Sequence, residues 1–210
     1  MRFPDEELLR RWREGNRAAG HELFKRYFDS ISRFFSSKNI EGPHCDDLIN
    51  DVFLGCVEGL PRFRGDASFR TLLYAIARNK LYNYYDRRAR ERKRFDFASA
   101  SLHDLGVVAH DQSARTEDKL LLEALQRLPL ETQAMLELHY WEGLKIKDLA
   151  TIFEMPASTV KTRMRKGRLA LEGFIHELGR NPQLIRSTLH GLDRWAKRVG
   201  APFRVTRSPQ

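Results

Sequence analysis

Hydroxyl and cationic side chains gather on one amphipathic segment near the C-terminal end of the chain. Apolar residues recur there every three or four positions and would form one buried stripe of a helix: Val160, Met164, Gly167, Leu171 and Phe174. The polar residues then occupy the opposite face and its flanks: Ser158, Thr159, Lys161, Thr162, Arg163, Arg165, Lys166 and Arg168. Such groups donate hydrogen bonds to phosphates and to base edges in the major groove of DNA. The alternative is a core helix with a solvated basic back.

A shorter apolar repeat directly precedes this segment. Ile146, Leu149, Ala150 and Phe153 give it one inward face, and the small Ala150 lets a second helix cross closely. Two short helices packed in this way form a helix-turn-helix, whose second helix enters the major groove. The apolar packing pattern and the positive charge of the second helix therefore both predict a module that binds duplex DNA.

A second signal lies in residues 62–94, where cations alternate with aromatic rings. The rings are Tyr74, Tyr82, Tyr84 and Tyr85. Flat rings stack on unpaired bases while Arg and Lys follow the phosphates, which is how single-stranded nucleic acid is usually held. Burial between helices is an equally strong interpretation for these tyrosines, and it must hold for some of them.

Residues for enzyme chemistry are scattered. The seven histidines form no H-E-x-x-H pattern, and the chain has no Gly-rich phosphate loop and no nucleophile with a local base. The pairs His103-Asp104 and His110-Asp111 fall in a polar stretch and are expected to be solvated. Cys45 and Cys56 lack C-x-x-C spacing, so reduced buried thiols are expected. We expect a protein that is not an enzyme and that binds no metal or cofactor.

Charge points to a polyanionic partner. The 210 residues carry 37 Lys and Arg against 28 Asp and Glu, a formal net charge of +9. Residues 60–94 and 157–173 are basic, whereas residues 95–156 between them are acidic. No apolar run approaches the length of about 20 residues that a membrane-spanning helix needs, and the N-terminus lacks the apolar segment of a signal peptide. We therefore expect a cytoplasmic location.

The elements that must position these residues all have the periodicity of helices. The pattern predicts two helices over 5–35 with a break at 15–20, and a third over 46–60 that Pro61 ends. After the loop 61–67, Ser68 can cap a long helix that runs toward the basic residues 87–94. Residues 1–94 are thus the first predicted domain.

Residues 95–116 lose this periodicity and are predicted to be a flexible linker. A second helical domain follows at 117–178, with predicted helices over 117–128, 131–141, 146–153 and 158–178. Residues 179–210 form a basic extension with one further amphipathic stretch from 184 to 199. The predicted fold class is all-α, with two small helical domains and a helical C-terminal extension.

The motifs resemble those of extracytoplasmic-function sigma factors of bacterial RNA polymerase. Residues 47–54 (DLINDVFL), 60–71 (LPRFRGDASFRT) and 73–79 (LYAIARN) are similar to region 2 of that family. Residues 128–129 (LP), 140–144 (YWEGL) and 159–164 (TVKTRM) are similar to its region 4. The resemblance covers roughly residues 5–178, with both motif sets in the right order. Glu154 stands where the family often has Gly.

The resemblance implies how promoter recognition is divided. Region 4 would read the minus-thirty-five element as duplex through the residues named above for the second helix. Region 2 would capture the non-template strand of the melted minus-ten element, with a flipped base held by the loop at 63–68. The residues that this reading assigns to the strand are Phe63, Arg64, Asp66, Ser68, Tyr74, Arg78, Asn79, Lys80, Tyr82, Arg87 and Arg88.

The resemblance also implies which residues bind RNA polymerase. Asp46, Asp47 and Asp51 match the acidic cluster that contacts the clamp helices of the largest subunit, and region 4 would contact the flap. His44 and Cys45 stand where the family often begins this cluster with an acidic residue. An anti-sigma factor or another regulator is a further partner that the resemblance allows. The rival interpretation is a helix-turn-helix regulator that binds duplex DNA without core polymerase.

Overall fold

The structure is a computed structural model of the chain, and it describes residues 3–40, 42–89, 98, 101–102, 116–179 and 181–188. Every regular element within these residues is helical. No described helix is long and apolar enough to cross a membrane. The expected all-α fold is confirmed.

The first module consists of α1 (Asp5–Arg13), α2 (Arg17–Ser36), α3 (Pro43–Gly59), a short 3-10 turn (Leu60–Arg62) and α4 (Phe69–Ala89). The side chain of Asn16 caps α2 by accepting a hydrogen bond from the Ala19 amide. The predicted break between the first two helices is confirmed, but it is shorter than the predicted 15–20, because α2 already begins at Arg17. The predicted capping of the long helix is also confirmed, because Ser68 Oγ accepts from the Thr71 amide at 3.1 Å.

The second module consists of α5 (Thr116–Gln126), α6 (Leu130–Tyr140), α7 (Ile146–Ile152) and α8 (Ala157–Leu178). A further helical stretch at 182–188 packs back on the end of α8, where Ile185 contacts Gly179. All four helices predicted for this part of the chain are confirmed within one or two residues. The remainder of the predicted C-terminal amphipathic stretch lies outside the described residues.

Each module is built on apolar side chains from the predicted faces. In the first module, fully buried side chains come from α2, α3 and α4, among them Leu23, Ile31, Val52 and Leu73. Burying one such side chain contributes about 1.5–3 kcal/mol, so these faces hold the helices together. Cys45 and Cys56 are free and buried in this module, as expected, and burial raises the pKa of Cys56 to about 12.

Ser101 and Leu102 are two of the described residues of the predicted linker, and both are buried. Leu102 is completely buried, and Ser101 forms an isolated antiparallel bridge with Pro129. The predicted linker therefore touches the second module at this point. The other residues that we assigned to it, apart from Ala98 and the first residue of α5, lie outside the described part of the chain.

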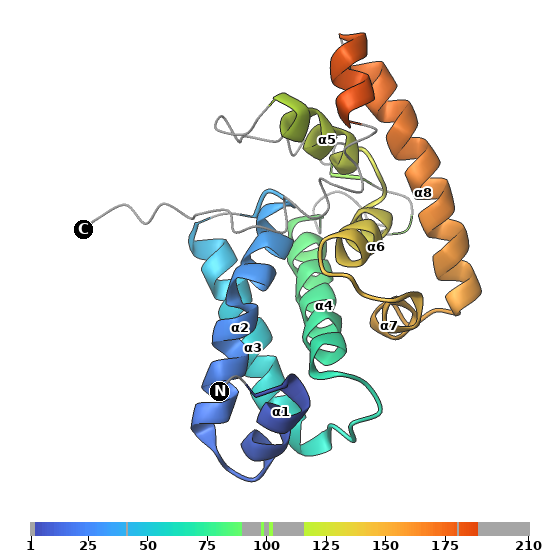
Figure 1. Ribbon diagram of the computed structural model, residues 1–210. Coiled ribbons are helices and arrows are strands. Elements are labelled where there is room, and N and C mark those ends of the chain that lie inside the picture. The colour runs from blue at the N-terminus through green and yellow to red at the C-terminus, as the bar shows by residue number, and fades with distance from the viewer. Residues whose placement is uncertain are drawn as a thin grey trace.

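The two modules pack directly against one another. Figure 1 shows α4 between the helices α2 and α3 on one side and α6 and α7 on the other. The α4–α7 packing is the main helix contact between the modules, and the buried apolar residues of both modules join into one cluster. Packing of this kind places the proposed strand-binding helix beside the proposed DNA-reading module.

Candidate nucleic-acid interface

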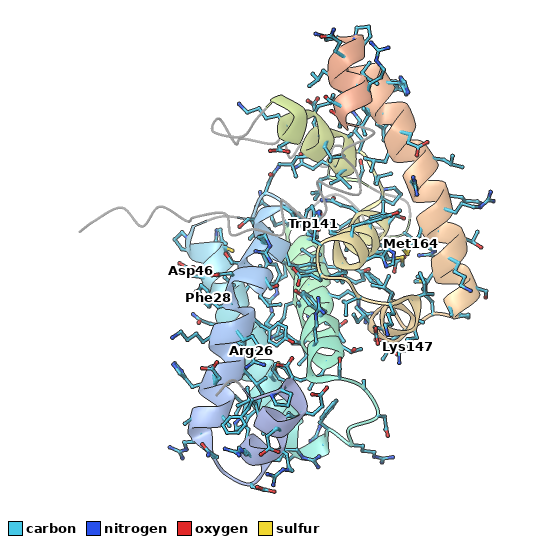
Figure 2. All side chains as sticks on the ribbon, viewed as in Figure 1. Arg26, Phe28, Asp46, Trp141, Lys147 and Met164 are labelled. Atoms are coloured by element: carbon cyan, nitrogen blue, oxygen red, sulfur yellow. The ribbon has the colours of Figure 1, made fainter. Side chains whose placement is uncertain are left out.

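The helix α8 presents the predicted polar face to solvent. Val160, Met164, Gly167 and Leu171 are buried as the periodicity predicted, and Figure 2 shows Met164 on the side of α8 that faces α6. The exposed residues at the start of the helix and along it are Ser158, Lys161, Thr162, Arg165, Lys166 and Arg168. Thr159 is half-buried. This exposed face has the hydroxyl and cationic donors that the phosphates of duplex DNA require.

Close packing of α8 on α6 fixes the orientation of this face. A Cβ atom at Gly167 would lie only 2.3 Å from Thr132 Cγ2. The two helices approach at a distance that only glycine allows at this position. Because Gly167 lies on the buried stripe, this approach turns the polar residues of α8 outward.

Arg163 differs from the other cations of α8. Its guanidinium donates to the carboxylate of Glu131 on α6, and the side chain is half-buried. Arg163 is therefore committed to an ion pair within its own module in this conformation. Arg168 pairs with Glu172 at 3.3 Å on the exposed surface, a contact that is worth little and leaves the side chain accessible.

The loop before α4 is open to solvent. Arg64, Asp66 and Ser68 are exposed, and Phe63 is half-buried. Gly65 has a φ of 88°, in the left-handed region that favours glycine, so the loop turns sharply between Arg64 and Asp66. The hydroxyl of Ser68 is already engaged in the cap of α4 and also lies 2.9 Å from Thr71 Oγ1. Ser68 therefore shapes the loop in addition to its predicted role.

One side of α4 carries accessible polar residues. Asn79, Arg87 and Arg88 are exposed, and Arg88 donates to the Tyr84 hydroxyl at 2.7 Å. Lys80 pairs with Asp51 of α3 at 3.2 Å. Both partners of that pair are accessible, so it is readily exchanged for a contact with another molecule.

The other side of α4 is covered by the second module. Arg78 is buried and donates to Glu154 at 2.5 Å and to Asn79 Oδ1 at 2.6 Å. Tyr82 donates to Glu131 at 3.2 Å and is largely withdrawn from solvent. Burial raises the pKa of the Tyr82 hydroxyl well above 10, although the nearby Arg78 opposes this. Neither residue is free for a DNA strand in this conformation.

Tyr74 requires a correction. Its ring is completely buried, with the Phe34 ring centroid 6.0 Å away, so no base can stack on it in this conformation. Burial and the negative charge of Glu142 raise the pKa of its hydroxyl well above 10. Tyr85 is likewise buried, and its hydroxyl donates to the Lys38 carbonyl at 2.5 Å. Burial is the correct interpretation for these two rings.

Sequence reasoning missed the polar contacts that join the modules. The buried Lys38, just after α2, pairs with the buried Glu137 of α6. Glu142, in the connection between α6 and α7, accepts from Ser30 at 2.7 Å and from Arg33 at 3.2 Å. The opposite charges of residues 60–94 and 95–156 were a signal only for the pairs Arg70–Glu142 and Arg78–Glu154. Lys38, Ser30 and Arg33 lie outside those stretches, and no local motif marked them.

The predicted acidic cluster is exposed on α3. Asp46, Asp47 and Asp51 are all accessible, and Leu54 shares the face of Asp47 and Asp51 with 54% of its surface exposed. Figure 2 shows Asp46 and Phe28 on the outer side of the first module, across the molecule from Lys147 on α7. An exposed surface that combines carboxylates with apolar side chains is typical of protein interfaces. Among the described residues there is no group of His, Cys, Asp and Glu that could hold a metal ion.

Comparisons with known proteins agree with this arrangement. The family model for sigma-70 region 2 matches residues 23–91, and the model for sigma-70 region 4 matches residues 118–171. The ECF RNA polymerase sigma-E factor of Haemophilus influenzae is 27% identical over 187 residues, covering 83% of this chain and 96% of that protein. The RNA polymerase sigma-H factor of Pseudomonas aeruginosa is 26% identical over 183 residues, covering 83% and 95%.

Solved structures support the fold. CnrH in complex with the cytosolic domain of CnrY matches with a TM-score of 0.62 and 21% identity, over 82% of this chain and 97% of that one. The sigma factor RpoE in complex with the anti-sigma factor NepR from Bartonella quintana matches with a TM-score of 0.54 and 20% identity, over 70% and 90%.

Proposed function

This chain belongs to the sigma-70 family, within its extracytoplasmic-function group, and we propose that its two modules direct core RNA polymerase to promoters by binding separate promoter elements. The first module corresponds to region 2 and the second to region 4. The observation that carries the proposal is the presence of two separate polar surfaces on these modules. One is the exposed face of α8, and the other is the loop 63–68 with the accessible side of α4.

Residues of α8 bind the minus-thirty-five element in this proposal. The exposed Ser158, Thr162 and Arg165 lie on one face and reach base edges, while the remaining cations contact phosphates. Thr159 takes part at the edge of this surface. Arg163 takes part only if DNA displaces Glu131, because that carboxylate holds its guanidinium in the free chain.

Residues of the first module bind the opened minus-ten strand. The accessible group comprises Phe63, Arg64, Asp66, Ser68, Asn79, Lys80, Arg87 and Arg88. Arg78 and Tyr82 join them when the second module moves away, since both contact that module in the closed chain. Tyr74 supports the helix packing and is omitted from the strand-binding group.

Core polymerase is the partner that brings these surfaces to one promoter. We infer that Asp46, Asp47 and Asp51 bind the clamp helices of the largest subunit, and that the second module contacts the flap. The chain itself makes and breaks no bond, and it acts in the cytoplasm with the polymerase. One solved structure with a similar fold is the sigma factor RpoE in complex with the anti-sigma factor NepR, which supports an anti-sigma factor as a further partner.

A transcription assay tests the proposal. Genomic fragments are transcribed by core polymerase with and without the purified chain, and the starts are mapped. We expect starts at a defined set of promoters only when the chain and core are both present. Specific binding of the chain to the same fragments without core, and no new starts with core, would instead support the helix-turn-helix regulator.

A further inference from the structure

Arginine side chains without an ion-pair partner lie at one end of the first module. The turn from α1 to α2, residues 13–17, and the start of the loop before α4, residues 62–66, together contain four arginines and two carboxylates. Figure 1 shows both segments at the same end of the module, where α4 begins. All four arginines are exposed and form no ion pair with another described residue: Arg13, Arg17, Arg62 and Arg64.

The arginines of α1 that precede this turn are paired instead. Arg10 lies 2.9 Å from Glu7 and 2.6 Å from Glu14, and Arg11 lies 2.6 Å from Glu7. Because Glu14 is paired in this way, Asp66 is the one carboxylate of the two segments that forms no ion pair within the described part of the chain. Positive charge is therefore in excess at this end of the module, and such an excess attracts an anionic ligand.

The first turn of α2 adds to this positive charge. Its backbone amides form the positive end of the helix dipole, where acidic side chains are favoured. The first turn of α1 contains three acidic residues, whereas α2 begins with Arg17 and has none in its first turn. A cation at this position costs stability unless an anion lies close to it. The start of α2 is thus better suited to a bound phosphate than to the free chain.

Trp12 fixes this turn against the start of α4. Its ring meets the ring of Phe69 edge to face, with the centroids 6.1 Å apart, and Phe69 is the first residue of α4. The Trp12 ring also lies so close to α2 that a Cβ atom at Gly20 would be 2.7 Å from Trp12 Nε1. These contacts hold the turn in a fixed position relative to the loop 63–68, which directly precedes Phe69.

We propose that the turn from α1 to α2 is a phosphate-binding site for the opened non-template strand downstream of the flipped base. Arg13 and Arg17 each contact one phosphate there, while Arg62 and Arg64 contact the phosphates next to the loop. Guanidinium groups bind phosphate oxygens through charge-assisted hydrogen bonds. Arg64 already belongs to the proposed strand-binding group, and the other three arginines extend it. This inference rests on the proposed function for the presence of the strand.

The order of the helices sets the direction in which the strand runs. The C-terminal end of α4 leads through residues 95–116 to the second module, which binds the upstream element in the proposed function. Arg87 and Arg88 at that end of α4 then face upstream, and the loop 63–68 at the other end faces downstream. Since the turn from α1 to α2 lies at the same end as the loop, its arginines meet the part of the strand that leads to the transcription start.

Binding of two single-stranded probes to the assembled holoenzyme tests this site. Both probes have the non-template sequence of one promoter mapped in the transcription assay, with fluorescein at the upstream end. The short probe ends directly after the minus-ten element, and the long probe continues to the transcription start. Fluorescence anisotropy at several salt concentrations measures the affinity of each holoenzyme for each probe.

Three variants separate charge from other effects. The charge-removing variant is Arg13→Gln with Arg17→Gln. Its matched control, Lys119→Gln with Arg186→Gln, removes two exposed cations from α5 and from the helical stretch at 182–188. The charge-keeping variant, Arg13→Lys with Arg17→Lys, retains cations that can still contact a phosphate as point charges.

Wild-type and control holoenzymes should bind the long probe more tightly than the short one, and the charge-removing variant should lose most of this preference. Loss of two phosphate contacts should weaken binding of the long probe roughly tenfold and reduce the slope of log affinity against log salt by about 1.4, since each contact to a single strand contributes about 0.7. The charge-keeping variant should retain the wild-type slope. An equal preference for the long probe in the charge-removing variant and the control would overturn the inference.

Thermal unfolding of the free chain separates a role in binding from a role in the fold. Arg17→Gln alone removes a cation from the positive end of the α2 dipole, so it should raise the melting temperature and yet weaken binding of the long probe. A lower melting temperature together with weaker binding of both probes would show that Arg17 serves the fold, and would overturn its assignment to the site.

The same measurements distinguish this inference from a polymerase contact and from the proposed function. Weaker assembly of the charge-removing variant with core polymerase, with an unchanged preference for the long probe, would assign the arginines to the polymerase and overturn the inference. Promoter-specific starts with equal probe preferences in variant and control would leave the proposed function intact and remove the phosphate site alone. Absence of any core-dependent start with the wild-type chain would remove the proposed function, and the site with it.

Discussion

Arg78 on α4 and Glu154 in the turn before α8 lie 2.5 Å apart, although 76 residues separate them in the chain. Their contact joins a residue of the proposed strand-binding surface to the turn that orients the proposed duplex-binding helix. The two DNA-binding surfaces are therefore physically coupled in the free chain. We therefore expect a substitution that removes the Arg78–Glu154 contact to affect both surfaces.

Replacing Glu154 by Gly should stabilise the second module. Glu154 has a φ of 53°. Glycine adopts this left-handed φ without strain, a gain of about 1 kcal/mol over a residue with a side chain. Loss of the ion pair with Arg78 should lower the stability by less than this gain. The reason is that 73% of the Glu154 side chain is exposed and solvent screens the interaction. Urea unfolding measures the change.

The control for that substitution is Glu154→Gln, which removes the charge and keeps the strained backbone. We expect the glycine variant to be about 1 kcal/mol more stable than the glutamine variant. A glycine variant no more stable than the glutamine variant would show that the turn is not strained.

Close approach of α8 to α6 predicts opposite effects at two glycines of α8. Gly167→Ala should destabilise the chain by about 1–3 kcal/mol, because the new Cβ overlaps Thr132. Gly173→Ala should stabilise it by up to about 1 kcal/mol, since nothing lies within 4 Å of that Cβ and alanine favours the helix. Thermal unfolding of both variants measures the difference, and equal effects would refute the close helix packing.

Acid should weaken the boundary between the modules through Glu142. Its pKa is lowered below 4.5 in the closed chain, where Ser30, Arg33, Arg70 and Tyr74 face it. Its ionised form therefore contributes stability that is fully present above pH 4.5 and is lost as the pH falls through the lowered value.

The Glu142→Gln variant makes this pH dependence measurable. In urea unfolding, it should be less stable than the wild-type chain at pH 7, and the difference should shrink below pH 4.5. A difference that does not change with pH would show that the carboxylate contributes nothing through its charge.

Much of the fold follows from sequence periodicity. The apolar stripe of α8 is local, repeating every three or four residues, so the sequence alone places Val160 and Met164 in the core. The cap at Ser68 is equally local. The boundary between the modules is different, because Lys38 and Glu137 are 99 residues apart and neither position has a motif. Their pairing depends on how two finished modules dock.

The positions of the candidate DNA-binding residues were predictable to about the same degree as the fold. Exposed donors on α8 lie opposite the apolar stripe, so the same periodicity places them. The tyrosines of α4 were ambiguous, since an aromatic ring suits both stacking on a base and burial. The ring of Tyr74 is buried against Phe34 of α2, and the hydroxyl of Tyr82 contacts Glu131 of the second module, so tertiary packing determines the position of both rings.

Removal of one phosphate contact from α8 should change the salt dependence of promoter binding. Lys166 is exposed on the side of α8 that we propose faces DNA, so Lys166→Ala should reduce the slope of log affinity against log salt by about 0.9 in the assembled holoenzyme. Lys119→Ala, an exposed lysine on α5, should leave the slope unchanged. Filter binding of promoter duplex over a range of salt concentrations measures both slopes, and equal slopes would place Lys166 away from DNA.

Polymerase binding should depend on the acidic face of α3. Asp47→Asn with Asp51→Asn removes two exposed carboxylates that share a face, and we expect weaker binding to core polymerase by roughly tenfold, from two charge-assisted contacts. Glu6→Gln with Glu14→Gln removes the same charge from exposed positions in or next to α1, away from this face of α3. Surface-plasmon measurements on immobilised core compare them, and equal affinities would place the clamp contact elsewhere.

Site-specific photocrosslinking in the assembled holoenzyme tests the central claim most directly. A photoreactive amino acid replaces Asn79 on α4 in one variant and Lys161 on α8 in another, and each variant is bound to a promoter. The account predicts that position 79 crosslinks to the opened non-template strand and position 161 to the upstream duplex, both only when core polymerase is present. Crosslinks of both positions to the same duplex segment, or an unchanged pattern without core, would contradict it.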